Sequence, residues 1–385
     1  MMNTVNISDL KLGVIAGGQL GKMLSLAAAN WDIETYVLDT DKTCPAAKSC
    51  SCFIEGDYLS YDDVYRFGKQ VDLLTFEIEN VNIEALKQLQ KEGLSIFPKP
   101  ESLELIKDKG LQKLFYQENG QPTAAFQLYD SKAAILKAIQ QKEILFPFVQ
   151  KLRTGGYDGR GVAIIRSEDK LENLLDGPSL IETCVDIEKE IAVIVARNES
   201  GNVKCFPVVE MEFNASANLV EKLIFPASLS KSITDEAEEI ATSIVDQLNF
   251  VGLLAVELFV DKSNRVWVNE VAPRPHNSGH HTIEGVITSQ YEQLLRAILN
   301  FPLGSTAIKM PCVMINLLGE PGFHGKVKYE GLNETLAIEG VKVHLYGKKE
   351  TRPFRKMGHV TILANSIEEA SKKADLVKDR LKVKS

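Results

Sequence analysis

Short apolar runs alternate with amphipathic segments over the first hundred residues, a pattern typical of a parallel α/β unit. The apolar runs predict strands, and the segments between them predict helices with one apolar face. The predicted strands are 11–16, 34–39, 52–55, 73–77 and 95–97, and the predicted helices are 20–30, 61–69 and 83–91. Ligands of parallel sheets bind at the carboxyl ends of the strands, so residues just after these strands are site candidates.

The pattern changes beyond residue 100. A helix over 102–119 leads away from the first layer, and Pro122 marks a boundary. From 124 to 185, strands and helices surround a glycine-rich loop; further strands are predicted at 190–197, 204–209, 253–260 and 266–271, with a helix at 234–249. After Pro302 a smaller α+β unit has strands near 313–318, 341–345 and 359–363 and a helix at 367–381. We therefore expect domains at 1–100, 101–302 (with a helical linker, 101–123, and a lid subdomain, 124–185) and 303–385.

A glycine-rich basic loop joins two of these strands. It runs from Arg153 to Gly161, holds four glycines and two arginines, and is followed directly by the apolar run 162–165. Glycines let backbone N–H groups approach anionic oxygens, and the arginines and nearby Lys151 can neutralise phosphate. No Gly-Lys-Ser/Thr sequence ends the loop, so it is not a Walker A loop. The pattern indicates a lid over a nucleotide triphosphate; the alternative is an ordinary hairpin turn.

The first predicted strand leads into the turn Gly17-Gly18-Gln19-Leu20-Gly21. This turn approximates the dinucleotide-binding fingerprint, with Ala16 at the first glycine position and Asp39 where a ribose-binding acid is expected. The alternative is a monophosphate at the helix N-terminus, where N–H groups and the helix dipole favour anions. We prefer the second interpretation because the fingerprint is degenerate.

Two carboxylates lie in apolar strand candidates late in the second domain. Glu257 lies in the run 254–260, and Glu270 lies in the run 266–271 with Asn269 beside it. Buried carboxylates need a cation or hydrogen-bond donors. Magnesium prefers oxygen ligands and shares them with substrate phosphates, so the sequence predicts a magnesium site at Glu257 and Glu270. The alternative is a pair of solvent-facing strand residues.

The segment 272–282 follows directly and contains two prolines that restrict its backbone. It offers side-chain donors for anions at Arg274, His276, Asn277 and Ser278. A rigid polar loop after a metal carboxylate is a candidate catalytic surface. Zinc bound by His276, His280 and His281 is a weaker alternative, because adjacent histidines rarely ligate one ion together.

Further candidates stand at strand ends. Glu77 and Glu79 follow the fourth predicted strand. The extended segment Glu182–Val185 could hydrogen-bond an adenine edge through its backbone, and Glu190 could accept ribose hydroxyls. The basic turn 348–356 could close on a phosphate, although such runs are usually solvated faces.

Composition and net charge limit the classes of partner that the protein can bind. A net charge of -8 over 385 residues argues against nucleic acid, while a local basic pocket remains compatible with it. The six cysteines form no CxxC pair, so we expect reduced thiols. No basic leader precedes an apolar run, and there is no stretch of 18 apolar residues. We therefore expect a cytoplasmic protein that has no membrane partner.

These motifs, in this order, resemble the ATP-grasp superfamily and, more closely, its 5-(carboxyamino)imidazole ribonucleotide synthase family. The matching segments are 17–21, 153–161, 269–274, 276–280 and 352–359, and together they span nearly the whole chain. The resemblance implies an α/β and α+β architecture with a parallel pre-ATP-grasp domain, a central split ATP-grasp domain and a small C-terminal α+β domain. It also implies a homodimer.

The resemblance implies a reaction in two steps. ATP phosphorylates bicarbonate, and the resulting carboxyphosphate delivers its carboxyl group to the exocyclic amine of 5-aminoimidazole ribonucleotide. ATP and magnesium, with manganese as an alternative metal, would be the cofactors. The ribonucleotide and bicarbonate would be the small-molecule partners.

The resemblance also implies residue roles. The ATP site would comprise Lys109, Lys151, Gly156, Tyr157, Asp158, Gly159, Arg160, Gly161, Val162, Glu182, Thr183, Cys184, Val185, Glu190, Asn269 and Glu270. The ribonucleotide and bicarbonate would meet Gln19, Leu20, Glu77, Tyr157, Asp158, Arg274, His276, Asn277, Ser278, Lys348 and Arg355. The catalytic residues would be Glu77, Tyr157, Arg160, Arg274, His276 and Asn277, and the metal ligands Glu257 and Glu270.

Two positions depart from the family pattern. Relatives often carry arginine at the position of Lys109 and glycine at the position of Ala16. Lysine keeps the charge and loses the bidentate fork of arginine. Three alternatives remain from the residues: another ATP-grasp ligase such as a formate-dependent glycinamide ribonucleotide transformylase, a non-catalytic nucleotide sensor, and an NAD-dependent oxidoreductase.

Overall fold

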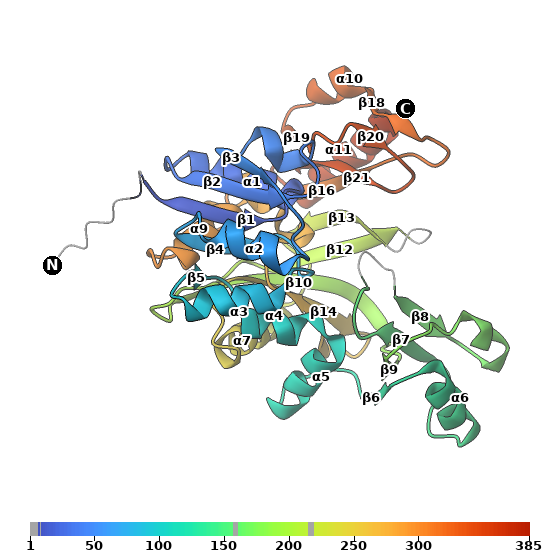
Figure 1. The fold of residues 1–385 in the computed structure, drawn as a ribbon. Coiled ribbons are helices and arrows are strands. Elements are labelled where there is room, and N and C mark those ends of the chain that lie inside the picture. The colour runs from blue at the N-terminus through green and yellow to red at the C-terminus, as the bar shows by residue number, and fades with distance from the viewer. Residues whose placement is uncertain (1–6, 8, 157–160, 215–218) are drawn as a thin grey trace.

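The computed structural model describes residues 7, 9–156, 161–214 and 219–385. Its N-terminal unit, blue to cyan in Figure 1, is a parallel five-stranded sheet in the order β3-β2-β1-β4-β5. The strands are β1 (Lys11–Ile15), β2 (Glu34–Asp39), β3 (Cys52–Glu55), β4 (Leu73–Phe76) and β5 (Ser95–Ile96). The helices between them are α1 (Gln19–Ala29), the 3-10 helix η1 (Pro45–Lys48), α2 (Tyr61–Gly68) and α3 (Ile83–Lys91). The predicted strands, and the three helices predicted between them, are confirmed to within one residue at each end.

Both faces of this sheet are buried, which explains its nearly continuous apolar strands. Leu12 and Val14 of β1 pack in one cluster with residues of α1, whereas Ile15 packs in another with residues of α2 and α3. The chain then turns at Ala16 and enters α1 at Gln19. The N-terminus of α1 therefore lies at the carboxyl edge of the sheet, where ligands of such sheets bind.

A four-stranded antiparallel sheet with α6 lies at the lower right of Figure 1, in the order β6-β9-β7-β8. Its elements are β6 (Phe126–Tyr129), α6 (Lys132–Gln140), β7 (Phe148–Leu152), β8 (Val162–Ile165), the 3-10 helix η2 (Glu168–Asn173) and β9 (Ser179–Thr183). The glycine-rich loop connects β7 to β8, so a strand follows it as expected. The candidates Tyr157, Asp158, Gly159 and Arg160 lie outside the described residues.

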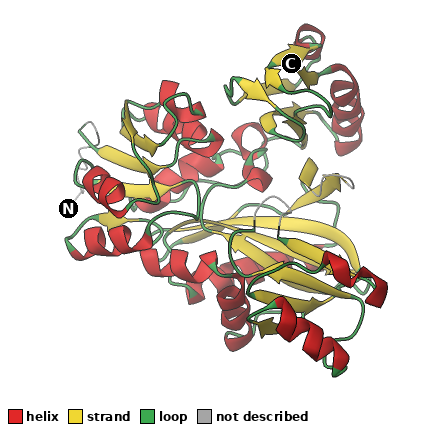
Figure 2. Cartoon of the chain, turned by 45° about the vertical axis from the view of Figure 1, so that its right-hand side comes forward, coloured by secondary structure: helices red, strands yellow, loops and turns green. Residues whose placement is uncertain are grey.

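A nine-stranded sheet forms the centre of the molecule, with strands drawn yellow in Figure 2. Its order is β15-β14-β10-β12-β13-β16-β21-β19, with β11 beside β10. The strands are β10 (Ile187–Arg197), β11 (Val203–Cys205), β12 (Val209–Asn214), β13 (Leu219–Phe225), β14 (Gly252–Asp261), β15 (Val266–Ala272), β16 (Cys312–Leu318), β19 (Val341–Leu345) and β21 (Lys356–Leu363).

Helices cover both faces of β14. Leu254 and Val256 pack in one cluster with α7 (Lys231–Gln247), whereas Leu253 and Ala255 pack in another with α9 (Gln290–Ile298). Burial on both sides explains why this strand is apolar without alternation. Glu257, further along the same strand, is therefore a charged residue in otherwise apolar surroundings.

The C-terminal strands extend the central sheet, because β16 pairs with β13 and carries β21 and β19 beyond it. The helix α11 (Ile367–Arg380) packs against β16 and β21. The sequence indicated a smaller unit after Pro302 but not this continuity. The remaining short elements are η3 (Asn277–Gly279), α8 (Thr282–Gly285), β17 (Gly325–Lys326), β18 (Lys328–Glu330), α10 (Leu332–Leu336), β20 (Glu350–Thr351) and β22 (Lys382–Lys384).

The single helix predicted over 102–119 is wrong. The structure has two helices, α4 (Pro100–Lys107) and α5 (Lys109–Glu118), separated by Asp108 in an extended conformation. The Asp108 side chain accepts hydrogen bonds from the N–H groups of Gly110 and Leu111, at 2.7 and 3.2 Å. It is therefore the N-cap of a new helix, a role that aspartate favours.

The strand predicted over 204–209 is also wrong, because β11 ends at Cys205 and β12 begins at Val209. Pro207 lies between them and has no N–H to donate to a ladder. Within the described residues, no helix combines the length and the low polarity that crossing a membrane requires.

Candidate active site

Glu257 and Glu270 face each other as directly paired residues of β14 and β15. Their side chains are 15% and 35% exposed. Like charges directly opposite each other on a sheet repel, so this pair needs nearby cations. Burial raises the pKa of Glu257, and the charges of Lys109, Lys356, Lys151 and Arg274 oppose that rise.

Lys109 supplies one of these cations and forms an ion pair with Glu270. It is the first residue of α5, and its N–H donates to the Arg153 carbonyl at 2.9 Å. Arg153 in turn pairs with the N-cap Asp108 at 2.6 Å. Burial, followed by the nearby charge of Lys151, lowers the pKa of Lys109 to about 8.

Lys151 bridges the small sheet and the central sheet. Its Nζ donates to the Asn269 side-chain oxygen at 2.7 Å and pairs with Glu182 at 2.8 Å. Glu182 is 4% exposed and also pairs with Lys113. Burial would raise the pKa of Glu182, but the charges of Lys151 and Lys113 outweigh it and hold that pKa below its usual range.

The side chain of Glu182 thus holds Lys151 in place, whereas the sequence assigned this segment only a backbone role. Sequence reasoning missed Lys113, which lies four residues after Lys109 and so one turn along α5. The spacing of two lysines at i and i+4 was the available signal.

The other predicted adenosine residues lie where β9 ends and β10 begins. Thr183 N–H donates to the Ala125 carbonyl at 3.0 Å, and Cys184 and Val185 connect the two strands. Glu190 lies on β10, where burial and then the charge of Glu257 raise its pKa to about 7. Of the predicted ATP-binding residues between 156 and 162, the structure describes Gly156, Gly161 and Val162.

The loop after β15 is fixed by Gln290, the first residue of α9. Gln290 accepts a hydrogen bond from the His276 N–H and donates one to the His276 carbonyl, both at 2.9 Å. Asn277 and Asn316 exchange side-chain hydrogen bonds at 2.8 and 2.9 Å. The loop is therefore held by buried side chains, and Gln290, 14 residues away, had no signal in the sequence.

The His276 ring points at the carboxylate pair. Its Nε2 lies 3.5 Å from Glu257, and its Nδ1 lies 2.9 Å from the Ser278 hydroxyl. Burial, followed by the charges of Arg274 and Lys356, lowers the pKa of His276 well below its usual range. His276 is therefore neutral at pH 7.

Arg274 pairs with Glu79 at 2.8 Å, which joins the central sheet to the edge of the parallel sheet. Its Nη1 donates to the Pro275 carbonyl at 3.1 Å. The Nε of Arg274 is buried and has no hydrogen-bond partner among the described residues. This N–H is available to an anion beside the carboxylates.

Further histidines pack behind the loop. His359 stacks on His344 and lies beside His280, with ring centroids 4.4 and 4.7 Å apart. Burial lowers the pKa of His280, His281 and His359, so these rings are neutral. Within the described part of the chain, no group of three or more His, Cys, Asp or Glu side chains is arranged to hold a metal ion.

Glu77 closes the first turn. It is 5% exposed, and its two carboxylate oxygens accept hydrogen bonds from the N–H groups of Gly18 and Gly21. Asp39 accepts from the Gly17 N–H at 2.7 Å. These carboxylates take the N–H groups to which we expected a monophosphate to bind, so the structure contradicts that interpretation of the turn. The same hydrogen bond gives Asp39 a role in the turn instead of the ribose contact of the NAD alternative.

The predicted ligand residues of this turn differ in their surroundings. Gln19 opens α1 and is partly exposed, whereas the Leu20 side chain is buried in the core. Lys22, one turn later, donates to the Leu345 carbonyl of β19 at 2.7 Å. The turn therefore meets the C-terminal strands, and Lys22 was not among the predicted residues.

The basic turn lies near this contact. Lys348 donates to the Lys356 carbonyl at 2.8 Å, and Arg355 donates to the Glu350 carbonyl at 2.6 Å. Lys356, which belongs to the predicted basic turn but was not singled out as a site residue, lies close enough to influence the pKa values of Glu257 and His276. The turn thus brings positive charge to the same region as the loop of His276.

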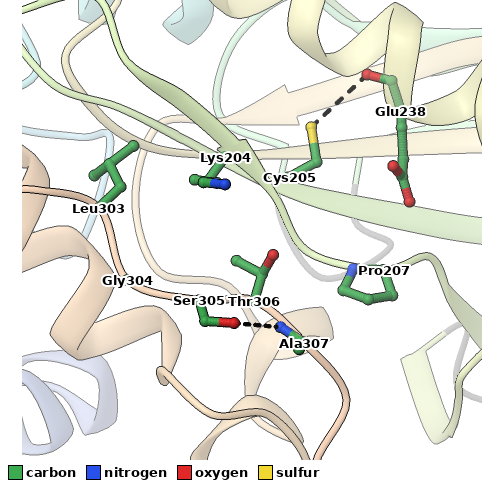
Figure 3. Close-up of a pocket in the computed structure, with 9 residues that line it drawn as sticks. All are labelled: Lys204, Cys205, Pro207, Glu238, Leu303, Gly304, Ser305, Thr306 and Ala307. Carbon is green, nitrogen blue, oxygen red and sulfur yellow. Dashed lines mark hydrogen bonds between the residues drawn. The ribbon is translucent and has the colours of Figure 1, made fainter.

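A separate surface pocket lies between β11, α7 and residues 303–307 (Figure 3). The Cys205 thiol is a weak donor to the Glu238 carbonyl at 3.7 Å, and the Ser305 hydroxyl accepts from the Ala307 N–H at 3.3 Å; both contacts are dashed in Figure 3. None of the predicted site residues lines this pocket.

Comparison with known proteins gives three family matches along the chain. Residues 10–107 match the ribonucleotide synthetase preATP-grasp domain, residues 114–291 the ATP-grasp domain, and residues 312–373 the phosphoribosylaminoimidazole carboxylase C-terminal domain. These matches confirm the resemblance to the ATP-grasp superfamily and the predicted fold class.

Individual proteins are similar over most of the chain. The N5-carboxyaminoimidazole ribonucleotide synthase of Bacillus subtilis is 34% identical and is covered over 92% of its length, with 93% of this chain aligned. A chloroplastic phosphoribosylaminoimidazole carboxylase of Vigna aconitifolia is 37% identical over 93% of this chain. The chain spans 65% of the length of that relative, and the same share of a carboxylase of Candida glabrata.

Solved structures of similar proteins superpose on most of this chain. The N5-carboxyaminoimidazole ribonucleotide synthetase of Thermotoga maritima superposes with a TM-score of 0.90 at 44% identity, covering 98% of this chain and 99% of that one. The synthase of Aspergillus clavatus in complex with ADP and 5-aminoimidazole ribonucleotide gives a TM-score of 0.88 at 30% identity, covering 97% and 99%.

Proposed function

Because this chain belongs to the N5-carboxyaminoimidazole ribonucleotide synthase family, we propose that it is an ATP-dependent carbon–nitrogen ligase of purine biosynthesis. Its substrates are bicarbonate and 5-aminoimidazole ribonucleotide. Its products are the N5-carboxylated ribonucleotide, ADP and phosphate. The observation that carries the proposal is the facing pair Glu257 and Glu270 with Lys109 and Lys151 beside it.

This arrangement supports the proposed ATP site. Lys109, Lys151 and the loop 156–162 contact the phosphates, and the segment 182–185 with Glu190 holds the adenosine. Glu257 and Glu270 fit magnesium or manganese, since two carboxylates supplemented by phosphate oxygens suit either ion. Such an ion stabilises charge on the transferring phosphoryl group.

The acceptor site lies between the first turn and the basic turn. Gln19 and Leu20 meet the ribonucleotide, together with Tyr157, Asp158 and Arg160. Lys348 and Arg355 take its phosphate. The hydrogen bond from Lys22 to Leu345 supports this location, because it brings the turn and the C-terminal strands together.

The carboxylation itself occurs beside the loop of His276. Arg274, Asn277 and Ser278 bind bicarbonate and then carboxyphosphate, with Glu77 orienting the first turn. The amine nitrogen bonds to the carboxyl carbon as the bond from that carbon to the phosphate oxygen breaks. The amine loses one proton in this step, and the His276 ring, which lies beside Glu257, is the proposed acceptor.

Closure of the site is part of the proposal, because carboxyphosphate decomposes in water. The glycine-rich connection between β7 and β8 supplies the cover. We further propose that the protein acts in the cytoplasm as a homodimer, as the family resemblance implies. Sedimentation equilibrium of the purified protein tests the dimer.

The proposed activity is tested by ADP release. We expect turnover with bicarbonate and 5-aminoimidazole ribonucleotide together, and no more than background hydrolysis when either is omitted. Turnover only with formate and glycinamide ribonucleotide would identify the chain as a transformylase. Nucleotide binding without turnover on either pair would identify a sensor.

A further inference from the structure

The two candidate metal carboxylates have a competing partner within the chain itself. Glu257 and Glu270 are directly opposite across β14 and β15, and Lys109 forms an ion pair with Glu270. The pair sits in a partly buried region, where uncompensated negative charge is unfavourable. The ammonium group of Lys109 therefore compensates the negative charge of the carboxylates, which a divalent cation would otherwise compensate.

The two lysines beside the carboxylates are held differently. Lys151 pairs with Glu182 at 2.8 Å and donates to Asn269 at 2.7 Å, and these two residues lie on separate strands. Lys109 has a fixed backbone instead, because its N–H donates to Arg153 and the preceding Asp108 caps α5. Its side chain is a flexible four-carbon stem, so the ammonium group can exchange partners while the backbone stays in place.

We propose that Lys109 competes with the divalent cation for Glu270, so that metal binding and the transfer of Lys109 to a nucleotide phosphate are one coupled event. Lys109 contacts one oxygen of Glu270, Oε2, and an ammonium group and a metal ion that share this carboxylate repel each other. When the metal ion arrives with ATP, the phosphate oxygens of ATP can accept the displaced ammonium group. Lys109 is then a positioning residue that couples the metal to the nucleotide.

This inference rests on the ATP and metal part of the proposed function. It predicts opposite effects from one substitution. A neutral side chain at position 109 leaves the carboxylates uncompensated, so the protein binds a divalent cation more tightly when no nucleotide is added. The same substitution removes a phosphate contact, so ATP binds more weakly.

The test measures Mn²⁺ binding by the electron paramagnetic resonance of free Mn²⁺, with full-length protein and no nucleotide. We expect Lys109→Met to bind Mn²⁺ on the order of tenfold more tightly than the wild type, because a competing charge is gone. Lys109→Arg keeps the charge and should bind Mn²⁺ like the wild type. Lys113→Met is the matched control: it removes a lysine one turn along α5 whose partner is Glu182.

A second set of measurements tests whether the Lys109→Met protein is folded. The thermal midpoint of Lys109→Met should rise on addition of Mn²⁺ alone, by more than that of the wild type, and circular dichroism should show an intact fold. Its affinity for ATP should fall on the order of tenfold. A folded Lys109→Met protein with unchanged Mn²⁺ affinity, or with unchanged ATP affinity, overturns the proposal. Carboxylation by the wild type is assayed separately, so its absence would defeat the proposed function and leave the metal result to stand alone.

Discussion

The nucleotide side and the histidine side of the candidate site accommodate buried titratable side chains in opposite ways. On the nucleotide side, the acidic groups Glu257 and Glu270 lie near cationic groups from other elements, among them Lys109. On the histidine side, rings such as His281 are buried as neutral groups and pack against carbon, as His281 does on Phe225 at 4.1 Å.

The difference shows which groups can act by charge and which act by shape. Ion pairs among partly exposed groups can be exchanged for ligand charges at little cost. The neutral rings of His280, His281 and His359 are fully buried and cannot take up a proton without losing their packing. We therefore expect charge-removing substitutions to abolish chemistry on the first side and to alter stability on the second.

The largest effect should come from Glu270→Gln. The substitution keeps the shape of the side chain and removes its charge, so turnover should fall by at least about 100-fold with the fold intact. Steady-state ADP release measures turnover, and Glu236→Gln, an exposed carboxylate of α7, is the control. Near-normal turnover in a folded variant would remove Glu270 from the metal site.

On the other side of the comparison, His281→Phe should change stability and its pH dependence. Burial lowers the pKa of His281 from 6.5 to about 3, so the unfolded chain takes up a proton below pH 6.5 while the folded chain does not. Protonation of the ring therefore has no effect on folding above pH 6.5, and it destabilises the fold increasingly as the pH falls from 6.5 towards 3. The slope is about 1.4 kcal/mol per pH unit.

In His281→Phe this contribution is absent, and urea denaturation between pH 6.5 and 4 should show a flatter decline than in the wild type. The ring nitrogens of His281 are buried and have at most a weak contact with the Ser278 backbone among the described residues, so the apolar variant should also be at least as stable at pH 7. Equal slopes in the two proteins would show that His281 does not remain neutral on folding.

A more modest effect is expected at the basic turn. Arg355→Ala should raise the KM for the ribonucleotide by about tenfold and leave kcat little changed, because a phosphate anchor acts mainly on binding. The KM for ATP serves as the internal control. A change confined to ATP would move Arg355 to the nucleotide side of the comparison.

The smallest effect concerns shape alone. Ala16 has a φ of 70°, a left-handed conformation that a Cβ disfavours. Ala16→Gly should therefore stabilise the protein by about 0.5 kcal/mol, after the greater flexibility of glycine in the unfolded chain is subtracted. Urea denaturation measures the change, and Ala27→Gly within α1 is the matched control, which should destabilise. Destabilisation by Ala16→Gly as well would contradict this account.

Much of the fold could be predicted because its causes are local. The strands of the N-terminal unit are short apolar runs between polar turns, and their bounds agree with the structure. The helix predicted over 102–119 failed because periodicity continues across Asp108, whereas the cap geometry at that residue starts a new helix. Capping depends on one side chain, so a periodic pattern does not reveal it.

The sequence singled out the two carboxylates of the candidate site but only some of the residues around them. Glu257 and Glu270 stand out as charges within apolar strands, and the short turn between the strands makes them neighbours. Lys113, Lys356 and Gln290 have no such contrast with their sequence surroundings. Their importance arises from partners on other elements, and the roles assigned to all site residues stay predictions.

The sequence alone determined the layers, the glycine-rich connection and the acidic strand pair, because each depends on residues close together in the chain. Only the tertiary structure decided that Glu77 binds the first turn, 59 and 56 residues away, and that Lys109 meets Glu270 across 161 residues. The physical reason is that a buried charge is satisfied by whatever the fold brings near it. That partner is set by the packing of whole sheets and helices, which no local pattern records.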